Sequence, residues 1–200
     1  MADVLRLCLD PHILVSHVRS TRRGSRRPLG HSSVWKSAAR DLVGIVQFGG
    51  SEVAAVQLVL SLDQLDEFSD ALRKAHFPEP VVRDISEDYM ELASIGPLHE
   101  NPHLILGGTG VLPAAGKPRR SLEIALAGRA HVLATEAITQ YITDDAEVLE
   151  DGEVLIHKSP DWSLVIATPQ RVAGWIRDEV FPDAVTIRNL ILNGPVPTPG

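Results

Sequence analysis

Short, almost continuously apolar runs recur along the chain, and segments with a helical pattern separate them. The apolar runs cover residues 4–9, 54–60, 131–135 and 164–169. A strand has this continuously apolar character when both faces of its sheet are covered. The segment that follows Ser61, a good helix N-cap, has the apolar period of a helix at Leu62, Leu65, Phe68 and Leu72. Because strands that alternate with helices form parallel sheets, we predict a three-layer α/β/α domain with a mainly parallel central sheet.

The other elements follow from the same patterns. We predict helices over residues 33–47, 81–95 and 170–180, and a short strand over residues 104–106. A further helix is predicted to begin at Arg119 or Ser121 and to end at Gly128. Residues 146–162 are predicted to form a β-hairpin that turns at Asp151-Gly152. Two hundred residues suffice for one domain with a sizeable core. We therefore predict a single domain over residues 1–190, with the hairpin as an insertion, and a disordered tail over residues 191–200.

Cysteine content and hydropathy indicate the compartment. The only cysteine, Cys8, excludes an internal disulfide, and its apolar run predicts that it is buried. No signal-peptide pattern opens the sequence, and no apolar stretch approaches the roughly 18 residues that a membrane span needs. We predict a soluble, cytoplasmic protein that does not contact a membrane.

The charge is distributed unevenly. The net charge is −7, but residues 1–40 contain eight Lys or Arg against Asp3 and Asp10, which gives +6 and leaves −13 for the rest. Half of these basic residues lie close together, at Arg22, Arg23, Arg26 and Arg27. Such a patch is able to bind the phosphates of a nucleic acid. A solvated loop, or a patch that binds an acidic protein, remains the alternative.

Several familiar site motifs are absent or weak. The GGTG at residues 107–110 lacks the lysine of a P-loop and the spacing of a dinucleotide fingerprint, so a turn is favoured. The single cysteine disfavours a structural zinc site, and no serine lies in a G-x-S-x-G elbow. Ser32 or Ser33 is instead predicted to be a helix N-cap.

Two acidic residues are better candidates. Asp10 directly follows the first apolar run, where a charge must be solvated, paired or bound to a cation. Glu67 lies on the helix after the second run, and ligands of parallel sheets bind at the carboxyl ends of the strands. Two converging carboxylates suit Mg²⁺ or Mn²⁺, which activates water in phosphodiester cleavage. For Glu67 alone, an exposed helix carboxylate is the alternative.

Four segments resemble the PIN-domain family in order and spacing. VLRLCLDPHILVSHV resembles the first strand with its metal-binding aspartate, and LVLSLDQLDEFSDAL resembles the helix whose glutamate corresponds to Glu67. LEIALAGRAHVLAT and LVIATPQRVAGWI are similar to the later helix–strand and strand–helix units. The resemblance covers about residues 4–177 and is strongest to VapC-like toxins of toxin–antitoxin systems. It implies a PIN-like (Rossmann-like) fold, a Mg²⁺- or Mn²⁺-dependent endoribonuclease, a homodimer and an antitoxin partner.

The sequence departs from that pattern at the acidic site. Where the family has a third acid, this chain has Pro118, Arg119 and Arg120. In the family a fourth acid lies in the turn after the fourth strand, and here that turn reads Thr135-Glu136-Ala137. Either Glu136 replaces this acid through a shift of one residue, or Thr135 completes the site. The resemblance thus assigns the metal and the catalysis to Asp10, Glu67 and Glu136.

These departures leave two functions open. One arginine charge about 6 Å from a divalent ion opposes ion binding by roughly 5 kcal/mol. The chain is then either an endoribonuclease with impaired catalytic acids or an inactive PIN-like module that binds RNA or a protein. In the inactive module we expect Arg119 to pair with Asp10. We expect Arg119, Arg120 and the arginines of residues 22–27 to contact RNA phosphates.

Overall fold

One seven-stranded sheet forms the centre of the molecule. The computed structural model describes residues 3–22, 33–47, 54–95, 104–105, 117–159 and 162–194. Five strands run parallel, and the strand order across the sheet is β3-β2-β1-β4-β7-β6-β5. The parallel strands are β1 (Asp3–Leu9), β2 (Ala54–Ser61), β3 (Leu104–Ile105), β4 (Val132–Ala134) and β7 (Ser163–Ala167). The antiparallel strands β5 (Ala146–Glu150) and β6 (Val154–Lys158) continue the sheet beyond β7. The predicted mainly parallel sheet with a hairpin is confirmed.

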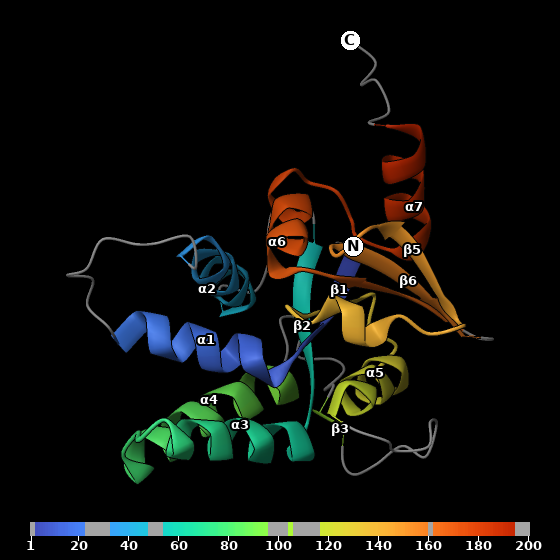
Figure 1. Cartoon of the computed structure of the whole chain (residues 1–200). Helices are drawn as coiled ribbons and strands as arrows, with labels where there is room; N and C mark the ends of the chain where they lie inside the picture. The colour runs from blue at the N-terminus through green and yellow to red at the C-terminus, as the bar shows by residue number, and fades with distance from the viewer. Residues whose placement is uncertain are drawn as a thin grey trace.

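Helices cover both faces of this sheet (Figure 1). On one side lie α1 (Pro11–Arg22), α2 (Ser33–Gln47), α3 (Leu62–Lys74), α4 (Glu79–Ile95) and α6 (Pro169–Arg177). The other side carries α5 (Lys117–Ala127) and the 3₁₀ helix η1 (Ile138–Tyr141). The helix α7 (Ala184–Asn193) packs against β5 and β7. This arrangement is the predicted three-layer α/β/α domain.

The alternation along β1 explains its continuously apolar sequence. Leu5, Leu7 and Leu9 are fully buried in the core on the α1 side, whereas Cys8 is buried in the core on the α5 side. Successive strand residues point to opposite faces, so a strand covered on both faces has apolar residues at nearly every position. The predicted burial of Cys8 is confirmed.

The sequence signals for the start of α3 and the hairpin turn have their expected local geometry. The Ser61 hydroxyl accepts a hydrogen bond from Gln64 N at 3.1 Å, and the Gln64 side chain accepts one from Ser61 N at 3.3 Å. This reciprocal pair is a capping box. In the hairpin, Gly152 has φ = 68°, a value that glycine adopts without strain.

Two helices were not among the predicted elements. The first is α1, which begins at Pro11, a residue suited to the first helical position. Arg22, predicted to lie in a loop, is the last residue of α1; Arg23, Arg26 and Arg27 lie outside the described residues. The second is α7, whose three last residues, 191–193, fall within the predicted tail. Gly194 follows as the C-cap of α7, and residues 195–200 lie outside the described part of the chain.

The helices differ in length and polarity. Within the residues that the structure describes, none is both long enough and apolar enough to cross a membrane.

Candidate functional site

Asp10 lies at the carboxyl edge of the parallel sheet. It directly follows β1, and its backbone N–H donates a hydrogen bond to Ala134 O of the neighbouring strand β4 at 3.0 Å. The side chain is only 9% exposed. In open parallel sheets this edge is where ligands bind. The position of Asp10 therefore makes it the starting point for a site.

Three protein groups donate hydrogen bonds to the Asp10 carboxylate. Oδ2 accepts from the Thr135 hydroxyl at 3.2 Å and from the Tyr141 hydroxyl at 3.3 Å. Oδ1 accepts from the backbone N–H of His12 at 3.1 Å. Ala137 N donates to Thr135 Oγ1 at 3.1 Å, which leaves the threonine hydroxyl hydrogen available for Asp10. Each carboxylate oxygen has two lone pairs, so both on Oδ2 are engaged and one on Oδ1 remains.

Tyr141 is held as a neutral donor. Its ring is 1% exposed. Burial raises the pKa of the Tyr141 phenol above its ordinary value, and the negative charge of Asp10 raises it further. The phenol is thus protonated at any physiological pH and keeps its hydrogen directed at the carboxylate.

The cysteine beside this cluster is a protonated thiol. Burial raises the pKa of Cys8 to about 12. Gln64 donates a weak hydrogen bond to Cys8 Sγ over 3.9 Å, and the Ser121 backbone oxygen lies 4.0 Å from the same sulfur. Because the thiolate is the reactive form, Cys8 is unsuited to nucleophilic chemistry. Its contacts instead show that the start of α3 and the first turns of α5 both lie beside the end of β1.

Thr135 is the predicted site residue that contacts Asp10. Glu136, the next residue, is exposed in the turn after β4. Glu67 is half-buried on α3, one turn beyond Gln64. In the described part of the chain, no three His, Cys, Asp or Glu side chains are grouped so that they could hold a metal ion. The metal and catalytic roles of Asp10, Glu67 and Glu136 stay predictions.

Basic residues occupy the first turn of α5, the end of the helix nearest Asp10. This turn contains Lys117, Arg119 and Arg120 and has no acidic residue. Basic side chains at a helix N-terminus are electrostatically unfavourable because the exposed N–H groups there already carry partial positive charge. Arg120 is exposed, whereas the side chain of Arg119 lies outside the described residues. The predicted pair between Arg119 and Asp10 therefore stays a prediction.

Tyr141 is the site residue that the sequence analysis missed. It lies 131 residues from Asp10, and the two meet because β4 pairs with β1, with Leu9 opposite Ala134. A weak signal existed, because Tyr141 is one of two tyrosines in the chain and follows closely after a predicted strand. Comparison of the chain with protein-family models, curated proteins and solved structures gives no significant match.

Proposed function

We propose that this chain is a cytoplasmic PIN-like module that binds RNA and in which metal-dependent cleavage is impaired. The proposal joins the resemblance of its four segments to the PIN-domain family with the chemistry around Asp10. It also includes the homodimer and the antitoxin-like protein partner that the resemblance implies. The alternative is an active Mg²⁺- or Mn²⁺-dependent endoribonuclease that uses Asp10, Glu67 and Glu136.

The observation that carries the proposal is that protein donors engage three of the four lone pairs of the Asp10 carboxylate. A divalent ion needs carboxylate lone pairs directed at it. Thr135 and Tyr141 occupy both lone pairs of Oδ2, and His12 N occupies one on Oδ1. A metal at Oδ2 would have to displace both hydroxyl hydrogens, which would leave two hydroxyl donors without this acceptor. Asp10 is thus satisfied without a cation.

The basic first turn of α5 supports the RNA part of the proposal. Two of its residues, Arg119 and Arg120, replace the family's acid, and the turn has no acidic residue to balance them. A helix N-terminus with added arginines favours an anion. Phosphate groups of RNA are anions of this kind, and arginine binds them in a bidentate manner. Together with the arginines of residues 22–27, this turn would contact the RNA backbone.

Metal binding separates the two functions. We expect the melting temperature of the wild-type protein not to rise with MnCl₂, because Asp10 offers no open pair of oxygens. Arg119→Asp should gain an Mn²⁺-dependent rise, since a ligand that binds only the folded state stabilises it. Arg83→Asp, on the exposed face of α4, is the matched charge control and should gain none. A wild-type rise that Asp10→Ala abolishes, accompanied by RNA cleavage, would establish the active enzyme instead.

RNA binding is measured separately, by titration of a fluorescent single-stranded RNA. Affinity should fall steeply between about 50 and 200 mM salt, because each neutralised phosphate releases counterions. Replacing Arg22, Arg23, Arg26 and Arg27 by alanine should weaken binding and flatten the salt dependence, whereas Arg83→Ala should change neither. If binding depends neither on salt nor on the four Arg→Ala substitutions, this would contradict the RNA role and favour an acidic protein partner.

A further inference from the structure

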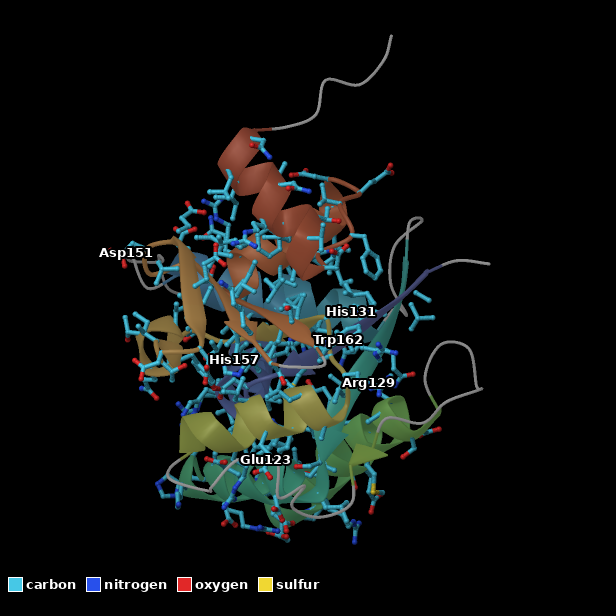
Figure 2. The ribbon with its side chains drawn as sticks, turned by 90° about the vertical axis from the view of Figure 1, so that its right-hand side faces the viewer. Glu123, Arg129, His131, Asp151, His157 and Trp162 are labelled. Carbon is cyan, nitrogen blue, oxygen red and sulfur yellow. The ribbon has the colours of Figure 1, made fainter. Side chains whose placement is uncertain are left out.

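A second polar site lies at the opposite end of α5 from Asp10. A cavity of about 320 Å³ opens there, lined by Trp162 and His131, by Ser159 and Ser163, and by the first residues of α7. Figure 2 shows Arg129, His131 and Trp162 close together beyond one end of α5. The volume lies at the lower end of the range for small-ligand pockets, roughly 300–1,000 Å³. None of these residues takes part in the Asp10 site.

The aromatic wall of this cavity is fixed before any ligand binds. Trp162 is half-buried, and its indole N–H donates a hydrogen bond to Ala130 O at 2.6 Å. The His131 ring lies 5.3 Å from the Trp162 ring and 5.1 Å from the Phe181 ring, centroid to centroid. His131 Nδ1 accepts a hydrogen bond from Arg6 N at 3.0 Å, which sets the orientation of its ring. A rigid wall of this kind loses little entropy when a planar ring stacks on it.

Two arginines lie beside the same wall, next to the residues that line the cavity, and have no counter-charge in the part of the chain that the structure describes. The Arg6 guanidinium carbon is 5.4 Å from the centre of the Trp162 ring, and Arg6 Nε donates to Arg129 O at 2.6 Å. Burial and the nearby charge of Arg129 lower the pKa of Arg6. Within the described residues, neither guanidinium forms an ion pair with a carboxylate. Two like charges placed together in this way favour an anion between them.

The acid in the cavity lining does not serve as that counter-charge. Asp183 accepts hydrogen bonds from Val185 N at 2.8 Å, from Thr186 N at 3.0 Å and from the Thr186 hydroxyl at 2.6 Å. These bonds cap α7 and leave the carboxylate with one lone pair. That lone pair and the two serine hydroxyls are hydrogen-bonding groups for the edge of a planar ring.

We propose that this cavity binds a nucleotide, with its base stacked on Trp162 and its phosphate held by Arg6 and Arg129. Base stacking on an aromatic side chain, with arginine beside the ring, is a common mode of nucleotide recognition that tolerates different bases. The nucleotide is either free or part of an RNA strand. Arg6 and Asp10 are four residues apart on one extended strand, roughly 13 Å, so this site is separate from the carboxyl-edge site.

The test uses nucleoside 5′-monophosphates, inorganic phosphate and a single-stranded oligoribonucleotide, each titrated into the full chain by calorimetry. Trp162→Ala should weaken nucleotide binding roughly tenfold or more, and Trp162→Phe should weaken it less because a ring remains. Arg129→Gln should also weaken it and reduce its salt dependence. Arg83→Gln, at an exposed arginine on α4, is the control and should bind like the wild type.

The results distinguish the source of the nucleotide. Binding of monophosphates as tight as that of the oligonucleotide indicates a free nucleotide, whereas binding of the oligonucleotide alone indicates RNA. If inorganic phosphate binds as tightly as a nucleoside monophosphate, the base contributes nothing to affinity, which would contradict its proposed stacking on Trp162. Unchanged affinity in Trp162→Phe and Arg129→Gln, or no heat with any probe, would overturn the site. These two conservative variants keep the test decisive if Trp162→Ala does not fold.

Discussion

Asp10 is a buried charge that neutral donors stabilise. An isolated carboxylate at its position would be very costly, and hydrogen bonds to a charged group each contribute about 1.5–3 kcal/mol. The hydroxyls of Thr135 and Tyr141 supply two of its three donors. These two residues should therefore be important for the stability of the fold as well as for the chemistry at this edge.

The two tyrosines of the chain test this stabilisation. Tyr141→Phe removes a donor to Asp10 and should lower the free energy of unfolding by about 1–3 kcal/mol. Tyr89→Phe is the matched control, because the Tyr89 hydroxyl is buried and has no hydrogen-bond partner in the part of the chain that the structure describes. Its removal should be neutral or stabilising. Urea unfolding measures both, and equal losses would contradict the role given to the Tyr141 hydroxyl.

The sequence could place Asp10 and offer Thr135 as its neighbour, but it did not indicate Tyr141. A charged residue directly after an apolar run has few structural explanations, so its location at the strand end was predictable. Tyr141 and Thr135 reach Asp10 through the pairing of β4 with β1, which joins residues far apart in the chain. Arg6 looked like an exception within a buried strand, and only its contacts with Trp162 and Arg129 explain it. Such contacts depend on tertiary structure and leave no local pattern.

At the scale of elements, the end of α5 packs closely against β2. A Cβ atom added to Gly128 would lie 2.3 Å from Val59 Cγ1 and 3.3 Å from the Ile124 backbone oxygen. Val59 is fully buried between the sheet and α5. Because protein cores are close-packed, there is no room for even one methyl group at this place.

A pair of glycine substitutions measures this contact. Gly128→Ala should destabilise the protein by about 1–3 kcal/mol through overpacking against Val59. Gly174→Ala, within α6, is the control, because an added Cβ there has no atom within 4 Å. Alanine is the better helix former, so this change should stabilise by about 0.5–1 kcal/mol. A Gly128→Ala variant with wild-type stability would show that β2 and α5 can separate at little cost.

Elements with a clear period were predictable, and those without one were not. The helices over residues 33–47 and after Ser61 follow their apolar spacing and caps. In α1, Ile13, Leu14 and Val15 are consecutive buried residues, a pattern more typical of a strand. In α7 only Ile187 is fully buried, and Val185 and Leu192 are more than 60% exposed, so no apolar stripe marks this helix.

At the scale of the whole molecule, several ionisable groups are buried in their neutral form. Burial raises the pKa of Cys8, from 9.0 to about 12, and raises those of Tyr89 and Tyr141 from 10.0. Burial lowers the pKa of His157 from 6.5, while the charge of Asp145 acts weakly in the opposite direction. Folding is therefore linked to pH on both sides of neutrality.

The signs of these shifts predict a stability maximum between about pH 6.5 and 9. Below pH 6.5 the unfolded chain takes up a proton at His157 that the folded protein binds less readily, so the free energy of unfolding should fall with pH. Above pH 9.0, and more steeply above 10.0, the unfolded chain loses protons from Cys8 and the tyrosines that the folded protein retains. Stability should then fall as pH rises.

Urea unfolding at a series of pH values, followed by tryptophan fluorescence, measures this profile. His157→Gln should make the free energy of unfolding less dependent on pH between about pH 5 and 6.5, where ordinary carboxylates are still ionised. It should leave the pH dependence above pH 9 unchanged. Tyr89→Phe should weaken the fall in stability at alkaline pH and leave the dependence below pH 6.5 unchanged. It removes a phenol with a raised pKa, and this phenol has no hydrogen-bond partner among the described residues. If His157→Gln leaves the pH dependence of stability below pH 6.5 unchanged, the folded protein protonates this imidazole as readily as the unfolded chain does. The Nδ1 of His157, which has no hydrogen-bond partner among the described residues, would then have to lie within reach of water.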